Sequence, residues 1–90
     1  MPKFVIERDF PEAGKLTPHE LQSASQSSAS VMQKLGQIHW VQSYVTDDKI
    51  YCVYVAPNEE MVRRHAEESG LPANRISQVR TVVDASTGDA

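Results

Sequence analysis

Residues 38–57 read IHWVQSYVTDDKIYCVYVAP, two runs of β-branched and aromatic residues separated by the polar segment Thr46-Asp47-Asp48-Lys49. Such residues favour strands, so this pattern predicts a β-hairpin. The connection contains no glycine, which favours a four-residue loop built on a type I turn, with Val45 facing Ile50. A three-residue loop would shift the register by one residue and exchange the faces.

The predicted register sorts the side chains of the hairpin onto two faces. One face is expected to carry His39, Val41, Ser43, Val45, Ile50, Cys52 and Tyr54, and the other Trp40, Gln42, Tyr44, Tyr51, Val53 and Val55. Both faces carry large apolar groups. We therefore expect helices to cover one face and a partner to cover the other.

Two further strands are predicted at the ends of the chain. Residues 3–9, KFVIERD, alternate between Phe4, Ile6 and Arg8 on one side and Val5, Glu7 and Asp9 on the other. Residues 76–84, ISQVRTVVD, form the last strand by alternation and β-branching. The carboxylates of the first strand lie either in water at a strand end or, for Glu7, in a cavity as a metal ligand or base.

Two helices are predicted from their capping residues. Thr17-Pro18-His19-Glu20 has the pattern of a capping box with proline in the first turn, and Gly36 ends this helix. Asn58 begins the second helix, and Ser69-Gly70-Leu71-Pro72 closes it.

The element order β-α-β-β-α-β predicts a ferredoxin-like α+β fold. Right-handed crossovers give a four-stranded antiparallel sheet of order 4-1-3-2 with both helices on one face. Residues 1–85 are expected to form a single domain and residues 86–90 a flexible C-terminal tail. The second face of the sheet has no predicted cover, which indicates a homodimer through that face or a ligand in a half-covered cavity.

Composition narrows the classes of function. The formal net charge of −3 at pH 7 gives no basic surface for nucleic acid or anionic lipid. No apolar run reaches the length of a membrane span, and residues 1–9 do not resemble a signal peptide. The chain has one cysteine, which cannot form an internal disulfide and suits a reducing cytoplasm.

Four side chains are candidates for binding a metal: Cys52, His65, Glu7 and His39. A cluster of imidazole, thiolate and carboxylate would favour nickel, cobalt or zinc over calcium or magnesium. The alternatives are that Cys52 is a small buried hydrophobic residue and that His65 is a buried, hydrogen-bonded histidine of the second helix. Catalysis by Ser43, His39 and Asp47 is rejected, because Ser43 and His39 lie four residues apart on one strand.

The chain also resembles a known family through Glu7-Arg8-Asp9, WVQSYVTDDKIYCVYVAPNEE and HAEESGLPANRI. This is a family of small bacterial ferredoxin-like proteins, first catalogued as a domain of unknown function, whose named class is a nickel-binding protein. The resemblance covers roughly residues 2–85 and implies nickel binding through Cys52 and His65, with Glu7 as a weaker match. The nickel-binding members of this family have histidine in the first strand and near the segment here reading Gly70-Leu71-Pro72, where this chain has Glu7-Arg8 and Leu71. The expectation is therefore nickel, another divalent transition metal, or no metal.

The leading hypothesis is therefore a cytoplasmic, homodimeric protein that binds a transition metal, for storage, buffering or sensing. The alternative is a small-molecule-binding or catalytic dimer with a cavity on the open sheet face, in which Glu7 or His39 acts as a base. An interaction module without chemistry is the third possibility.

Overall fold

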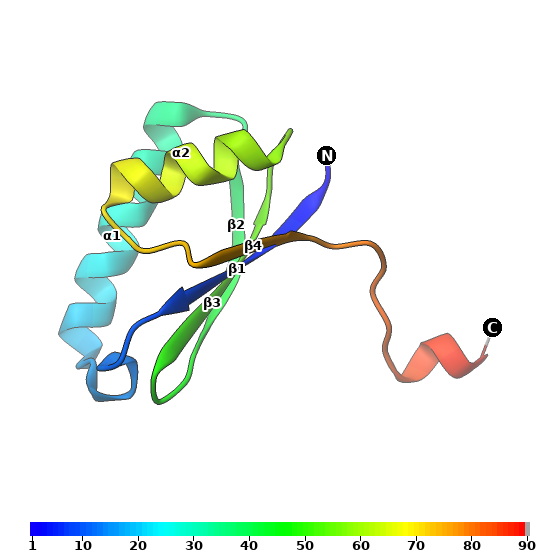
Figure 1. The fold of residues 1–90 in the computed structure, drawn as a ribbon, viewed down its shortest axis with the longest axis horizontal. Coiled ribbons are helices and arrows are strands. Elements are labelled where there is room, and N and C mark those ends of the chain that lie inside the picture. The colour runs from blue at the N-terminus through cyan, green and yellow to red at the C-terminus, as the bar shows by residue number, and fades with distance from the viewer. Residues whose placement is uncertain (90) are drawn as a thin grey trace.

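The computed structural model describes residues 1–89 and contains a four-stranded sheet with both α-helices on one side (Figure 1). Its elements, in chain order, are β1 (Lys3–Asp9), η1 (Ala13–Lys15), α1 (Pro18–Leu35), β2 (His39–Val45), β3 (Lys49–Val55), α2 (Glu59–Ser69), β4 (Arg75–Gln78) and η2 (Ala85–Asp89). The strand order is β2-β3-β1-β4, and all three pairings are antiparallel. The predicted ferredoxin-like order 4-1-3-2 is thereby confirmed.

Both α-helices begin at the residues that the sequence indicates. The Thr17 hydroxyl accepts a hydrogen bond from the Glu20 amide at 3.1 Å, and the Glu20 carboxylate accepts one from the Thr17 amide at 3.0 Å. Asn58 caps α2 by accepting from the Met61 amide. Each cap satisfies backbone donors that would otherwise lack a partner at the helix start.

The hydrophobic core lies between the helices and one face of the sheet. Alternation along β1 buries Phe4, Ile6 and Arg8 and leaves the intervening residues partly exposed. The buried cluster consists of Phe4, Ile6, Met32, Ile38, Cys52, Tyr54, Ala56 and Val62. We call this side of the sheet the covered face and the opposite side the open face.

The hairpin register is confirmed near the turn and wrong beyond it. Val45 faces Ile50 and Ser43 faces Cys52, as predicted, but the register shifts between Trp40 and Gln42. This β-bulge pairs Trp40 with Tyr54, so Trp40 packs against the core instead of lying on the open face. His39 pairs with Val55 on the open face. The prediction that His39 shares a face with Cys52 is therefore wrong.

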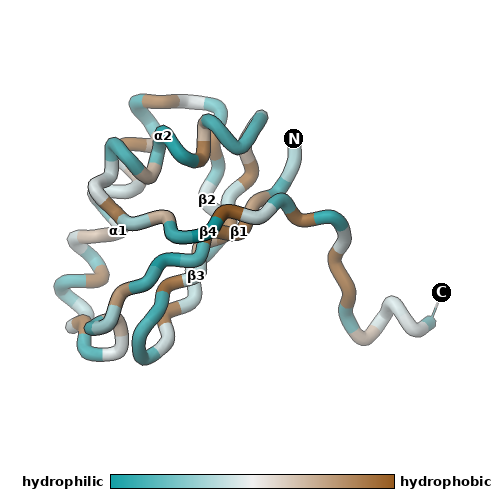
Figure 2. The backbone as a smooth tube through the Cα atoms, in the orientation of Figure 1, coloured by the Kyte–Doolittle hydropathy of each residue, from teal (hydrophilic) through white to brown (hydrophobic). Residues whose placement is uncertain are grey.

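The last strand is shorter than predicted. β4 pairs with β1 only over Arg75–Gln78, whereas the alternation indicated a strand as far as Asp84. The Val79 amide still donates to the Lys3 carbonyl, and the chain then leaves the sheet (Figure 1). Figure 2 shows a hydrophobic stretch in this departing segment, where Val82 and Val83 are 66% and 71% exposed.

The loop after β1 is fastened to the turn of the hairpin. The Phe10 amide donates to the Asp48 carbonyl, and the Gly14 amide donates to the Asp47 carbonyl at 2.9 Å. A Cβ at position 14 would lie 2.8 Å from the Asp47 Cα, so the close approach requires glycine. Among residues 1–89, neither α-helix has the length and hydrophobicity needed to cross a bilayer.

Candidate functional site

The four candidate metal ligands do not come together in one chain. Cys52 and His65 are buried on the covered face, while Glu7 and His39 lie on the open face. Within residues 1–89, no three side chains among histidine, cysteine, aspartate and glutamate are grouped closely enough to hold a metal ion. The predicted ligand roles of these residues stay predictions, but a single four-ligand site in one chain does not form.

A buried arginine links the covered-face candidates. Arg8 is 1% exposed, and its Nε donates to the Cys52 Sγ at 3.4 Å. One terminal nitrogen donates to the Pro72 carbonyl at 2.6 Å, and the other donates to the Tyr54 hydroxyl at 3.4 Å. The guanidinium therefore connects β1, β3 and the segment that follows α2.

Tyr54 keeps its proton in this setting. Burial raises the pKa of Tyr54 to about 12, reinforced by Cys52 and opposed by the positive charge and hydrogen bond of Arg8. The hydroxyl accepts from Arg8 and still carries a hydrogen that it can donate. The interior therefore contains a neutral phenol beside a cation.

His65 is held beside the same group by α2. Its Nε2 lies 3.2 Å from the Ser28 hydroxyl, 3.4 Å from the Ser28 carbonyl and 3.3 Å from the Ser69 hydroxyl. A carbonyl can only accept, so Nε2 carries the hydrogen, and the buried Nδ1 has no hydrogen-bond partner among residues 1–89. Burial lowers the pKa of His65, and the Arg8 charge lowers it further against the opposing Ser28 hydrogen bond. The protonated imidazole is therefore disfavoured in the folded protein.

A pocket of about 210 Å³ opens between α1 and the β2–β3 hairpin. Arg8, Cys52, Tyr54 and Ser28 are among the lining residues that carry polar atoms. Its other lining residues are Leu21, Ala24, Ser25, Trp40, Ser43, Val45, Ile50 and Leu71. The Trp40 indole nitrogen donates to the Ser43 hydroxyl at 2.9 Å, which fixes one wall. This pocket lies on the covered face, whereas the sequence suggested a cavity on the open face.

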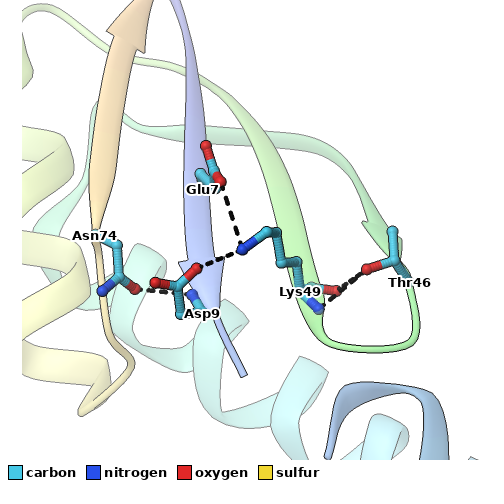
Figure 3. Close-up of polar contacts among 5 residues, drawn as sticks. All are labelled: Glu7, Asp9, Thr46, Lys49 and Asn74. Atoms are coloured by element: carbon cyan, nitrogen blue, oxygen red, sulfur yellow. Dashed lines mark hydrogen bonds and ion pairs between the residues drawn. The ribbon is translucent and has the colours of Figure 1, made fainter. Parts of the chain in front are cut away.

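The open face carries a cluster of charges at the end of β1 (Figure 3). The Lys49 ammonium lies 2.8 Å from the Asp9 carboxylate and 3.8 Å from the Glu7 carboxylate. Asn74 accepts a hydrogen bond from the Asp9 amide, and Thr46 bonds to Lys49 across the hairpin turn. The hydrogen bond to Asp9 and its negative charge raise the pKa of Lys49. Two carboxylates thus share one cation at the surface.

The two faces differ in how well they fit nickel. On the covered face, the Cys52 sulfur already accepts from Arg8, and this fixed positive charge would repel a divalent cation. His65 offers an unpartnered Nδ1, but Arg8 also disfavours positive charge there. On the open face, Glu7 and Asp9 present oxygen donors to a cation, and a metal ion could replace the Lys49 ammonium. The interior does not fit nickel, and the open face offers an incomplete set of ligands.

Arg8 is not among the candidate site residues predicted from the sequence. The alternation of β1 could have indicated a buried Arg8, because it places Arg8 on the same side as Phe4 and Ile6. A charged residue at a core position of a central strand is uncommon unless it has a partner or a role.

Comparisons with known proteins agree with this architecture. A family model described as "Nickel responsive protein SCO4226-like" matches residues 4–79. The crystal structure of SCO4226 from Streptomyces coelicolor A3(2) is similar to this chain, with a TM-score of 0.77 and 24% sequence identity. The similarity covers 90% of this chain and 99% of that chain, and at this identity it supports the fold alone. A comparison with curated proteins gives no match.

Proposed function

We propose that this chain, which belongs to the SCO4226-like family of nickel responsive proteins, is a homodimeric nickel-binding protein that stores, buffers or senses the metal. The family match over residues 4–79 confirms the resemblance seen in the sequence, and the family description is the observation that supports a nickel-related role. The organisation of the sheet supports the rest of the proposal. Within residues 1–89 no group of potential ligands is complete, which supports a site shared between two copies.

The open face supports the homodimer. It carries Val5, Tyr51, Val53 and Val55, which are only partly buried, and Tyr44, which is 53% exposed. An apolar sheet face of this kind is stabilised when a second copy covers it. The exposed Val82 and Val83 of the departing C-terminal segment add a second apolar surface that a neighbouring copy could cover.

The open face also supports a metal site shared between two copies. Glu7 faces Tyr51, whereas His39 faces Val55, four residues further along β3. At about 3.4 Å per residue, these rows are about 14 Å apart in one chain, too far for one metal ion. In a two-fold dimer, Glu7 and Asp9 of one copy can approach His39 of the other. Imidazole and carboxylate ligands together suit nickel.

Nickel titration of untagged protein, followed by calorimetry, tests the proposal. We expect saturable binding that requires the dimer, and a loss of affinity of about tenfold or more in both Glu7→Gln and His39→Ala. His19→Ala is the matched control, because it removes an exposed imidazole from α1. Its affinity should equal that of the wild type.

Two results would contradict the proposal. One is a monomer in sedimentation at micromolar concentration, with or without nickel. The other is an affinity that falls in Cys52→Ser and His65→Ala but not in Glu7→Gln and His39→Ala, which would place the metal in the interior. Sedimentation of each variant shows whether it still dimerises. A variant that loses nickel affinity but remains a dimer has lost a ligand and not the interface.

A further inference from the structure

The pocket beneath α1 is built around a buried cation that lacks an acidic partner. Arg8 is 1% exposed, and its three hydrogen-bond partners are a sulfur, a phenol oxygen and a peptide carbonyl. None of the ion pairs formed within residues 1–89 includes Arg8. Charges removed from water are normally paired, because an isolated buried charge is costly. A bound anion would therefore supply the negative charge that Arg8 lacks within the described chain.

The guanidinium also has N–H donors that form no hydrogen bond within residues 1–89. A guanidinium carries five N–H groups, and three of those of Arg8 are used within the described part of the chain. Arginine presents its donors in a planar fork that matches the two oxygens of a carboxylate. Tyr54, whose hydroxyl accepts from Arg8 and keeps its own hydrogen, adds a donor beside the fork.

The residues that line the pocket indicate the polarity, charge and size of the ligand. Leu21, Ala24, Trp40, Ile50 and Leu71 are mainly apolar, while Ser25, Ser28 and Ser43 add hydroxyls. Among residues 1–89, Arg8 is the one cation in the lining. A single positive charge balances a monoanion and leaves a dianion half compensated. A cavity of about 150 Å³ can hold benzene, so a pocket of about 210 Å³ has room for a ring that bears a carboxylate.

We propose that this pocket binds a small organic monocarboxylate whose apolar, ring-sized body lies against Trp40 and Leu21 and whose carboxylate pairs with Arg8. The site is separate from the nickel site, because it lies on the other face of the sheet and is lined by a cation that repels metal ions. Its ligand binds between α1 and the hairpin. Binding therefore stabilises the covered face without contacting the open face.

Titration of chelator-treated wild-type protein with benzoate and with benzamide tests the proposal. The two probes share a ring and nearly the same shape, but only benzoate is charged. Trp40 is the one tryptophan of the chain and lines the pocket, so its fluorescence reports occupancy directly. We expect saturable benzoate binding, with benzamide weaker by about tenfold or more, because a charge-assisted bond to a buried guanidinium is strong.

Two matched variants locate the binding site. Ala24→Phe fills the pocket from an exposed helix position and should abolish benzoate binding without unfolding the protein. Ser27→Phe places the same side chain on α1 away from the pocket lining, and should bind benzoate like the wild type.

A third variant tests the geometry of the guanidinium. Arg8→Lys keeps a positive charge but loses the planar pair of donors, so benzoate affinity should fall while benzamide affinity stays unchanged.

Three outcomes would overturn the proposal. The first is the absence of saturable benzoate binding, and the second is equal affinity for benzoate and benzamide. The third is a neutral-pH ultraviolet thiolate signal that disappears in Cys52→Ser, because the Cys52 sulfur would then already be the anion paired with Arg8. All three are read without nickel, so failure of this proposal is distinct from failure of the metal proposal.

Discussion

The covered and open faces of the sheet differ in how their charged side chains are compensated, although β1 contributes residues to both. On the open face, Glu7 and Asp9 pair with Lys49 in contact with water. On the covered face, Arg8 lies between them in sequence but is buried with neutral partners. Exposed ion pairs contribute little to stability, whereas a buried charge must be compensated. The comparison indicates that the open face suits cations and the covered face suits an anion.

This division explains why a metal site seemed plausible from the sequence and yet did not form in one chain. Cys52 and Glu7 are both near the middle of neighbouring strands, but side chains alternate between faces along a strand. Glu7 faces Tyr51, whereas Cys52 faces Ile6. Residues that are near neighbours in the sheet can therefore be separated by its full thickness.

The largest expected loss of stability comes from a substitution on β1, and it is best compared with the same substitution at the neighbouring residue. Ile6→Ala should reduce the free energy of unfolding by about 2–5 kcal/mol, because Ile6 is fully buried and a cavity would remain. Val5→Ala lies on the open face and should cost less. If a second copy covers this face, the cost of Val5→Ala should grow with protein concentration, since dimerisation adds to apparent stability. Urea denaturation at several protein concentrations measures both.

Concentration is the control in this experiment. The difference between wild type and Ile6→Ala should persist under conditions in which the protein is monomeric. Equal losses in Ile6→Ala and Val5→Ala in the monomer would show that both faces are covered within one chain.

Much of the fold could be predicted because its signals are local. Thr17 with Glu20, and Asn58 with its following acidic pair, mark helix starts through contacts within one turn, and the structure reproduces both. The hairpin register near Val45 and Ile50 follows from the length of the turn. Such signals depend on short stretches of sequence, so tertiary packing seldom overrides them.

The missed features depend on contacts that a linear pattern does not contain. The bulge near Val41 directs Trp40 into the core, where α1 and Tyr54 define the available space. The shortened β4 reflects the length over which β1 offers pairing partners. In the candidate site, the buried Arg8 is held by hydrogen bonds to Pro72 and Tyr54, which lie 64 and 46 residues away in sequence.

A smaller effect is expected where the loop after β1 meets the hairpin turn. Gly14→Ala should destabilise the protein by about 1–3 kcal/mol, the usual cost of overpacking, because the new Cβ would lie 2.8 Å from backbone of Asp47. The dimerisation constant should not change, since this contact does not involve the open face. Gly88→Ala is the matched control, because a Cβ there meets no atom within 4 Å. An unchanged denaturation midpoint in Gly14→Ala would mean that the loop moves freely from the turn.

The cap of α1 should have an effect of about 1 kcal/mol. Thr17→Ala removes the hydroxyl that accepts from the Glu20 amide, and loss of such a cap destabilises a helix by this amount. Because α1 forms one wall of the pocket, benzoate affinity should fall slightly while nickel affinity stays constant. Thr17→Ser keeps the hydroxyl and should behave like the wild type. A change in nickel affinity without a change in stability would contradict the separation of the two faces.

The smallest expected effect is the pH dependence that His65 adds to the covered face. Burial lowers the pKa of His65 in the folded protein, with a further contribution from Arg8, whereas the unfolded chain has an ordinary histidine pKa of about 6.5. The unfolded state therefore binds more protons as the pH falls below about 6.5, and the free energy of unfolding decreases. This decrease ends once the pH has passed below the folded pKa. His65→Asn cannot titrate, so the difference in stability between wild type and variant should shift in favour of the variant as the pH falls from 7 to 5. Urea denaturation of both proteins across that range measures the shift. A constant difference would mean that His65 is equally easy to protonate in the folded and unfolded states, and that the covered face tolerates a second positive charge beside Arg8.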